Sequence, residues 1–261
     1  GGLVAEKCLE ALREPFHVQE HELFVTGSLG ISIYPQDAKD PGQLHRNADS
    51  AMYQAKARGK NGFAYFTPDL NLRAQERMEL EGLLRRALDL GEFQLYYQPQ
   101  FRFDGSLSGC EALLRWFHPR LGPISPARFI PVAEENGFIL PIGNWVLKEA
   151  CRQLAAWNAP DDFLMAVNVS SLQFQREDWA DQVAAVLAET GLHPRRLELE
   201  LTESLVMDNP LQAATRLASL RKLGVRVAVD DFGTGYSSLS YLQRFPLDTL
   251  KIDQSFVRDI F

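Results

Sequence analysis

Several apolar runs of the sequence end on, or just before, polar side chains that could hold a metal ion or a phosphate group. These side chains are Glu111, Asn168, Glu200, the pair Asp230 and Asp231, and Lys251. If the runs are strands of parallel βα units, their carboxyl ends meet at one mouth of the fold, where such folds build their sites. The sequence therefore predicts that these side chains come together from distant parts of the chain.

The alternation of side chains along a strand supports this prediction. Successive residues of a strand point to opposite faces, so Glu198, Glu200 and Thr202 share one face while the other carries only leucine. Lys251 and Asp253 share a face in the same way. We expect the charged faces to point inward and the apolar faces to meet surrounding helices.

A cluster of buried carboxylates is costly unless cations neutralise it. The candidate ligands are carboxylate and amide oxygens with no cysteine or histidine nearby, which suits Mg²⁺ or Mn²⁺ better than Zn²⁺. Two such ions could hold a phosphodiester, lower the pKa of a bridging water and stabilise the leaving oxygen. Lys251 could hold that water in line, so the sequence predicts a two-metal site that cleaves phosphodiesters.

Each of these residues also has a simpler interpretation. A lone acid or lysine at a strand end is usually a solvated turn residue, and the glycines of DDFGTG (230–235) could simply allow a turn with positive φ. Residues 236–238 (YSS) would then begin a helix whose N–H groups could meet an anion. Arg115 could form a salt bridge at the rim of the fold. A Schiff-base role for Lys251 is disfavoured, because it needs a cation-rich setting that lowers the pKa of the amine.

Short apolar strands alternate with amphipathic helices from Phe93 onward, which indicates parallel βα units. The expected strands are FQLYYQPQF, LSGCEALLRW, FLMAVNVS, RLELELTES, VRVAVDDFG and TLKIDQSF. Two helices are well delimited, because Gly191 ends the first, Asn209 and Pro210 begin the second and Gly224 ends it. An eight-stranded barrel takes about 250 residues. We therefore predict an α/β fold in residues 93–261, a TIM-like (β/α) barrel without its last two strands, rather than an open sheet.

The segment before Phe93 divides into two further parts. Residues 1–66 are expected to form a helix (AEKCLEALREPF), a strand pair (LFVTGSLGISIYP), a helix (LHRNADSAMYQAKARGKN) and a strand (GFAYF). The apolar stripe of that second helix is Leu44, Ala48, Ala51, Met52 and Ala55. Residues 67–92 are expected to form a charged connector helix. The apolar positions that it would pack onto the following domain are Leu80, Leu83, Leu84, Ala87 and Leu88.

Composition excludes several classes of protein. The 261 residues are 46% hydrophobic and 23% charged, which is ordinary for a globular protein. A formal net charge of −7 argues against a polybasic surface for polymeric nucleic acid or a membrane. Cys8, Cys110 and Cys151 are far apart and suggest neither disulfides nor zinc. No run approaches the about 18 apolar residues of a membrane span, so a reducing, cytoplasmic location is expected.

From EALLRW at Glu111 onward the motifs also carry a family resemblance. EALLRW is followed in order by ISPARFIPVAEENG, NVS, ELTES, DDFGTGYSSL and KIDQSFV. With these motifs in register, the chain from about Phe93 to its end resembles the EAL family of bacterial cyclic di-GMP phosphodiesterases. Residues 1–66 resemble the C-terminal half of a GGDEF domain in GSLGISIYP, ADSAMYQAK and GKNG. The whole chain therefore resembles part of a tandem GGDEF-EAL protein.

The resemblance implies a metal site and a reaction. Glu111, Asn168, Glu200 and Asp230 match the metal ligands of the family, and Asp231 also takes part at the metal pair. The implied cofactors are two divalent ions, Mg²⁺ or Mn²⁺. The implied reaction is the hydrolysis of cyclic di-GMP to linear pGpG.

The resemblance also implies roles around the metals. Lys251 resembles the family lysine that orients the nucleophilic water, and Glu203 matches the acid that supports the DDFGTG loop. Gln98 and Arg115 correspond to positions that line the dinucleotide pocket, with the arginine near a phosphate. A homodimer through the EAL domain is one assembly consistent with the family.

Two family features are absent from the sequence. The GGDEF signature is absent, so cyclase activity is not expected, and Lys56 and Lys60, which match phosphate-contacting positions, are expected to be solvated. The AEGVE strand with its site glutamate is also absent, so we expect impaired or no turnover from residues 1–261 alone. Two alternatives stay open: a non-catalytic cyclic di-GMP receptor that signals through the connector helix, and a parent protein tethered to the inner membrane by upstream domains.

Overall fold

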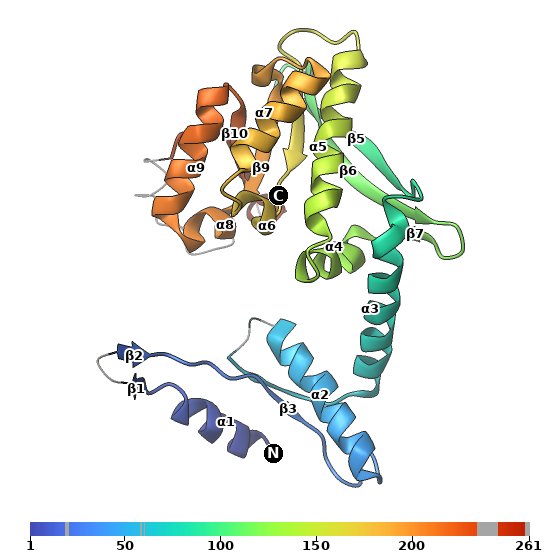
Figure 1. The fold of residues 1–261 in the computed structure, drawn as a ribbon, viewed down its shortest axis with the longest axis vertical. Coiled ribbons are helices and arrows are strands. Elements are labelled where there is room, and N and C mark those ends of the chain that lie inside the picture. Colours follow the sequence, from blue (N-terminus) through green and yellow to red (C-terminus); the bar gives the residue numbers. More distant parts are fainter. Residues whose placement is uncertain (19–20, 58, 60, 234–244, 259–261) are drawn as a thin grey trace. The chain divides into compact units, whose positions relative to one another are not determined.

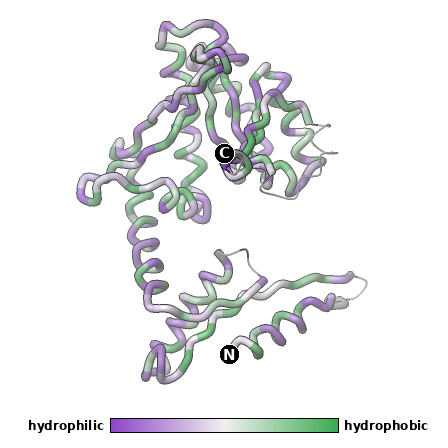
Figure 2. Tube along the Cα trace, turned by 180° about the vertical axis from the view of Figure 1, so that it is seen from behind, coloured by the Kyte–Doolittle hydropathy of each residue, from purple (hydrophilic) through white to green (hydrophobic). Residues whose placement is uncertain are grey.

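The computed structural model describes residues 1–18, 21–57, 59, 61–233 and 245–258 (Figure 1). The chain divides into two compact units, Gly1–Gly82 and Leu83–Phe261. Helix α3 (Pro68–Ala87) contains the boundary between them. Hydrophilic and hydrophobic residues are mixed along this helix (Figure 2), in keeping with the charged helix predicted for residues 67–92.

The first unit is a small α/β arrangement. Its elements before α3 are α1 (Gly2–Ala11), β1 (Phe16–Val18), β2 (His21–Leu23), β3 (Leu29–Ile31), α2 (Pro41–Ala57) and β4 (Phe63–Tyr65). Strands β3 and β4 pair in parallel and α2 packs on them. Their shared core contains Ala51 and Ala55 of the predicted apolar stripe, together with Ala64, Phe66 and Leu70.

The prediction that residues 23–35 form a pair of strands is wrong. Strand β2 instead pairs antiparallel with β1, and β3 pairs with β4. The first helix also ends at Ala11, and Phe16, which was expected in that helix, begins β1. Pro15 explains this end, because proline lacks an N–H and disfavours helical geometry in the residue before it.

The second unit is built on one curved sheet flanked by helices. Its elements are β5 (Phe93–Phe101), β6 (Leu107–His118), β7 (Gly122–Ile124), α4 (Pro126–Glu135), α5 (Ile139–Ala156), β8 (Leu164–Asn168), α6 (Ser171–Phe174), α7 (Trp179–Thr190), the 3₁₀ turn Pro194–Arg196, β9 (Leu197–Thr202), α8 (Glu203–Asp208), α9 (Pro210–Leu223), β10 (Arg226–Phe232), β11 (Thr249–Ile252) and α11 (Gln254–Arg258). The strand order is β11-β10-β9-β8-β6-β5. Strands β6, β8, β9, β10 and β11 are parallel to one another, which is the βα arrangement of a TIM-like barrel.

Strand β5 departs from the predicted parallel pattern. It pairs antiparallel with β6, and Gln98 lies opposite Glu111. Only residues 102–106 separate the two strands, whereas a parallel crossover needs a dozen or more residues. Strand β7 also pairs antiparallel with β6. The first strand of this unit is therefore one arm of a hairpin.

The outer layer of the second unit covers the leucine faces of the sheet. Helices α5, α7 and α9 lie side by side along the sheet (Figure 1). Leu197, Leu199 and Leu201 of β9 are buried on one face, as predicted, while Glu198 and Glu200 are 3% and 1% exposed on the other. The predicted helix ends are confirmed at Gly191 and Gly224, both with positive φ.

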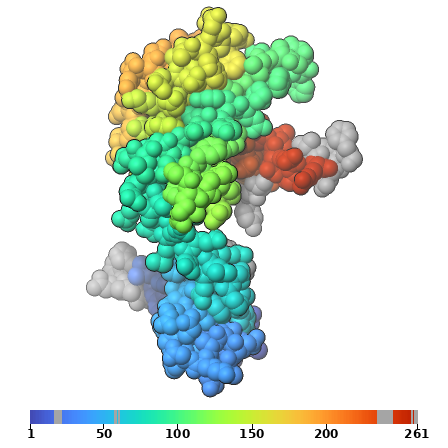
Figure 3. All heavy atoms as spheres, turned by 90° about the vertical axis from the view of Figure 1, so that its right-hand side faces the viewer, coloured from blue at the N-terminus to red at the C-terminus, as the bar shows by residue number. Residues whose placement is uncertain are grey.

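Strand β11 differs from β9 in its outward face. Leu250 and Ile252 are 41% and 62% exposed, so the expectation that both apolar faces meet helices holds for β9 and fails for β11. The C-terminal segment that contains β11 lies at the surface (red in Figure 3). The position of β11 therefore depends mainly on its inward side chains and on its backbone pairing with β10.

Gly143 of α5 marks a close contact behind the strand that carries Asn168. A Cβ at this position would lie 2.3 Å from Gln173 Oε1. Gln173 is 3% exposed and is held by a capping box with Ser170 at the start of α6. The contact therefore leaves no room for a larger residue at position 143.

We predict that Gly143→Ala lowers the free energy of unfolding by about 1–3 kcal/mol, because overpacking displaces Gln173. Gly82→Ala is the matched control, since a Cβ there meets nothing within 4 Å. Gly82→Ala should raise the free energy of unfolding by up to about 1 kcal/mol, because alanine has a better helix propensity than glycine. Urea denaturation of both variants measures the difference, and equal stabilities would show that the contact with Gln173 imposes no constraint.

Candidate active site

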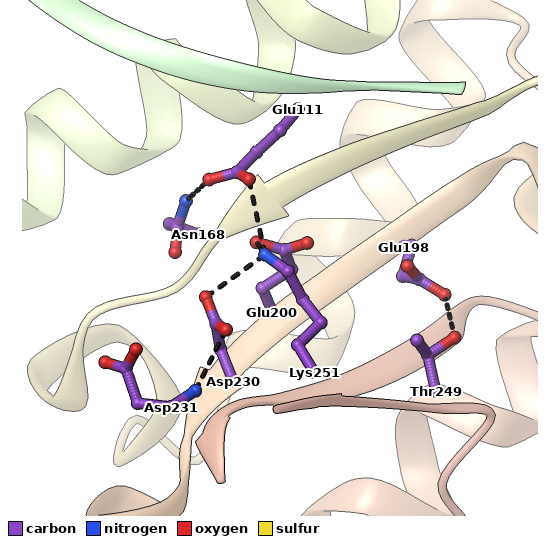
Figure 4. Close-up of polar contacts among 8 residues, drawn as sticks. All are labelled: Glu111, Asn168, Glu198, Glu200, Asp230, Asp231, Thr249 and Lys251. Atoms are coloured by element: carbon purple, nitrogen blue, oxygen red, sulfur yellow. Dashed lines mark hydrogen bonds and ion pairs between the residues drawn. The ribbon is translucent and has the colours of Figure 1, made fainter. Parts of the chain in front are cut away.

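The parallel strands bring the predicted polar residues to one place. Glu111 of β6, Asn168 of β8, Glu200 of β9, Asp230 of β10 and Lys251 of β11 point toward one another (Figure 4). The register explains the convergence, because Asn168 pairs with Glu200 and Glu200 pairs with Ala228, two residues before Asp230. Residues separated by two positions in a strand share a face, so these side chains all lie on the inner side of the sheet.

The ammonium of Lys251 lies at the centre of this cluster. Its Nζ donates to Glu200 Oε2 at 2.8 Å, to Asp230 Oδ2 at 3.1 Å and to Glu111 Oε2 at 3.2 Å. A lysine ammonium has three donors, so these contacts account for all of them. Three carboxylates from three strands therefore face a single point in space.

Burial determines the electrostatics of the cluster. Burial raises the pKa of Glu200 to about 7; the hydrogen bond from Lys251 opposes the rise, and the charges of Glu111 and Asp230 add to it. Burial disfavours the charged form of Lys251, but its contacts with Glu200, Glu111 and Asp230 outweigh burial and raise the pKa of the ammonium. The lysine is therefore held as a cation among acids, opposite to what a Schiff-base nucleophile requires.

Two oxygens of the cluster are oriented for a further ligand. The Oε1 atom of Glu200 is buried and has no hydrogen-bond partner in the part of the chain that the structure describes, which costs free energy unless something else satisfies it. Asn168 donates its amide nitrogen to Glu111 Oε1 at 2.8 Å, and this turns its carbonyl oxygen away from Glu111. Within the described part of the chain, no three acidic, histidine or cysteine side chains form a ready metal-ligand set, and Lys251 lies between the acids.

The end of β10 has an irregular backbone at the two aspartates. The pairing of β10 with β11 shifts register between Val229 and Phe232. Asp231 lies within this irregularity with a φ of 54°, a left-handed conformation that is uncommon for residues other than glycine. Its backbone N–H donates to Asp230 Oδ1 at 2.9 Å. Burial and the charges of Asp230 and Asp253 raise the pKa of Asp231.

Glu203 supports the turn that follows β10. It is 1% exposed, and its Oε2 accepts a hydrogen bond from the backbone N–H of Gly233 at 2.7 Å. Gly233 has a φ of 100°, and a Cβ there would lie 2.6 Å from the ring of Phe256. Tyr236, Ser237 and Ser238, considered as the start of an anion-binding helix, lie outside the described residues.

Gln98 and Arg115 lie beside the cluster on the first hairpin of the sheet. Residues opposite each other in an antiparallel pair share a face, so Gln98 lies on the same face as Glu111. Arg115 is two pairs further along that face, with its guanidinium 5.6 Å from the ring centre of Tyr96. The hairpin therefore carries an amide, an aromatic ring and a cation in succession along the face that bears Glu111.

Two polar residues beneath the cluster had no predicted role. The carboxylate of Glu198 accepts a hydrogen bond from the hydroxyl of Thr249 (Figure 4). Glu198 precedes Glu200 by two residues and Thr249 precedes Lys251 by two. The same alternation that predicted the inward acids could therefore have placed this pair one layer below the site.

The fold and the site together define a TIM-like α/β barrel protein with an acidic site at the carboxyl ends of its parallel strands. The EAL domain model matches residues 81–261, and the model of the GGDEF diguanylate cyclase domain matches residues 2–62. The chain belongs to the EAL domain family.

Relatives support this assignment along nearly the whole chain. The bifunctional diguanylate cyclase/cyclic di-GMP phosphodiesterase MucR of Pseudomonas aeruginosa is 43% identical over 260 residues, covering 98% of this chain and 38% of the relative. The cyclic di-GMP phosphodiesterase PdeR of Escherichia coli is 40% identical over 258 residues, covering 98% of this chain and 39% of the relative. The chain thus spans less than half the length of these relatives.

The solved structure of the PaMucR phosphodiesterase in complex with c-di-GMP has the same fold. It is 45% identical in sequence with a TM-score of 0.67, covering 69% of this chain and 74% of that one. At this identity the likeness extends beyond the fold to the family.

We predict that Lys251→Met lowers the free energy of unfolding by about 1–3 kcal/mol without divalent metal, because the buried Glu200 carboxylate loses its hydrogen-bond donor. Adding Glu200→Gln should recover part of that loss, since it removes the buried charge. Chemical denaturation with EDTA, above the pKa of Glu200, measures both effects.

Lys148→Met is the control for loss of a lysine. Lys148 pairs with Glu189 at an exposed position, where an ion pair contributes about 0–1 kcal/mol. If Lys251→Met is no more destabilised than Lys148→Met, the three acids do not depend on the central ammonium.

Proposed function

We propose that this chain forms the catalytic region of a phosphodiesterase that hydrolyses cyclic di-GMP to linear pGpG. The observation that carries the proposal is the convergence of the Glu111, Glu200 and Asp230 carboxylates on one point. Membership of the EAL family and the names of the relatives support it. Together they favour a site that handles a phosphodiester.

Two divalent ions, Mg²⁺ or Mn²⁺, are the proposed cofactors. The residues fit such ions, because Glu111, Asn168, Glu200, Asp230 and Asp231 supply oxygen ligands, and Glu200 Oε1 is buried with no hydrogen-bond partner among the described residues. When bound, the ions would lower the pKa of a water and neutralise the charge of the phosphodiester. They would compete with the Lys251 ammonium for the acid oxygens.

The other site residues have proposed roles in orientation and binding. Lys251 stays protonated because acids surround it, and it would donate a hydrogen bond that orients the attacking water once the ions take acid oxygens from it. Asp231 takes part at the metal pair, and Glu203 holds the turn at Gly233 in place. Gln98 and Arg115 bind the dinucleotide, with the guanidinium next to a phosphate, the pairing that arginine favours.

The cellular setting is proposed at a coarser level. No helix among the described residues has the length and apolar content to cross a bilayer. We propose a cytoplasmic site of action, where cyclic di-GMP would be met, and a homodimer through the EAL domain. Residues 1–66, 67–92 and 93–261 are the proposed partial GGDEF-type domain, connector and EAL domain.

A non-catalytic receptor for cyclic di-GMP is the second candidate. The observation in its favour is the ammonium of Lys251 among the acids, which leaves no ready metal-ligand set in the described residues. A receptor would bind the dinucleotide with equal affinity with and without divalent metal and would form no pGpG. An enzyme would form pGpG only when metal is present.

We predict that, in a chain extended through the AEGVE strand that residues 1–261 lack, Glu111→Ala lowers the turnover of cyclic di-GMP by at least about a hundredfold, because it removes one of the three converging carboxylates. The measurement is the rate of pGpG formation by chromatography with Mg²⁺ or Mn²⁺. Glu189→Ala, at an exposed ion pair, is the matched control and should keep wild-type turnover. Wild-type turnover in Glu111→Ala would remove this acid from the mechanism.

We also predict that chelation abolishes turnover reversibly. EDTA should reduce pGpG formation to background, and excess Mg²⁺ or Mn²⁺ should restore it, because the oxygen donors suit these hard cations. Zn²⁺ should restore less, since the site has no cysteine or histidine ligand. Turnover that persists after chelation and dialysis would exclude a metal-dependent reaction.

A further inference from the structure

A buried polar pair lies one layer beneath the proposed active site. Glu198 is 3% exposed, and its Oε2 accepts a hydrogen bond from Thr249 Oγ1 at 2.7 Å (Figure 4). The same oxygen accepts from Arg226 Nε at 3.3 Å. Burying a carboxylate is unfavourable unless it is paired, and here a cation and a hydroxyl from two neighbouring strands pair with it.

This pair repeats the geometry of the site above it. Glu198 of β9 reaches diagonally across β10 to Thr249 of β11, and Glu200 reaches across the same strand to Lys251. Ala228 of β10 is level with both Glu200 and Thr249. Its side chain is small and fully buried, which leaves space for both contacts to pass over it.

Strand β11 needs such an anchor more than its neighbours do. It has only four residues, its register with β10 is irregular, and its outward side chains are exposed. Lys251 must nevertheless reach three carboxylates within 3.2 Å. A shift of one residue would turn Lys251 to the other face of the sheet.

We propose that Glu198 is a positioning residue that holds Lys251 in place through Thr249, an inference that rests on the proposed function of Lys251. The Glu198–Thr249 hydrogen bond fixes the position of β11 along the strand direction relative to β9. It acts two residues away from the site and does not touch the reacting groups. Its loss lets the ammonium leave the point where the three carboxylates meet.

Thr249→Val removes the hydroxyl donor and keeps the shape of the side chain. In the chain extended through the AEGVE strand, we expect kcat for cyclic di-GMP to fall about ten- to a hundredfold, the usual effect of losing an outer support of a catalytic group, while KM changes little. Thr249→Ser keeps the donor and should retain most of kcat. Thr215→Val, which removes an exposed threonine hydroxyl from α9, is the matched control.

A double-mutant cycle tests whether the two residues act through one bond. Glu198→Met should lower kcat as Thr249→Val does, and the double variant should be no slower than either single variant, because all three lack the same contact. Glu198→Gln keeps an acceptor and should rescue most of the rate. The proposal would be overturned if the fold-reduction in kcat of the double variant equalled the product of the two single reductions.

A spectroscopic readout separates this inference from the proposed function. The ¹H–¹⁵N signal of the Lys251 ammonium, assigned by its loss in Lys251→Met, should be visible when three carboxylates slow its exchange with water. It should vanish in Thr249→Val and persist in Thr249→Ser and Thr215→Val, whether or not the protein hydrolyses cyclic di-GMP. Should Thr249→Val not fold, Thr249→Ala removes the donor without added bulk.

An unchanged Lys251 signal together with unchanged kcat in a folded Thr249→Val or Thr249→Ala variant would overturn the proposal. If the wild-type chain extended through the AEGVE strand forms no pGpG, the proposed function fails, and the signal alone then decides the positioning role. A fall in melting temperature with kcat and signal intact would show a purely structural role and would also overturn it.

Discussion

The second unit depends on one electrostatic constraint, the gathering of acids from separate strands around a single cation. Glu111, Glu200 and Asp230 would repel one another at this distance, and burial already raises the pKa of Glu200 to about 7. Lys251 offsets part of this repulsion by donating to all three. Because each partner comes from a different strand, the interaction is possible only when β6, β9, β10 and β11 are in register.

Further contacts hold some of the residues in and around this cluster. Asn168 donates a hydrogen bond to Glu111, the backbone N–H of Asp231 donates to the Asp230 carboxylate, and Glu203 accepts from the backbone N–H of Gly233. Outside the sheet, the leucine faces bind the helices, so apolar burial stabilises the scaffold while polar contacts shape the site. The acids can therefore stay close together, because the helices hold the strands from the other face of the sheet.

The alternation of side chains predicted which residues point inward where a strand is buried on both faces. It did not predict the direction of strand pairing where that direction depends on loop length. It predicted the inward Glu200 and the outward leucines of β9, because burial imposes a strict period of two. It did not distinguish the antiparallel β5 from a parallel strand. That distinction depends on the length of the connection, because residues 102–106 are too few for a parallel crossover. The strand pair expected before Pro35 failed for a related reason, because pairing partners are chosen by tertiary contacts.

The amino-acid sequence by itself determined the family, the helix ends at Gly191 and Gly224, and the residue types of the site, because motifs and turn residues act locally. Only the tertiary structure decided that Lys251 lies at the centre of the acids and that Glu198 meets Thr249 beneath them. These contacts join residues far apart in the chain. Their distances follow from strand register and from the small side chain of Ala228, neither of which a one-dimensional pattern specifies.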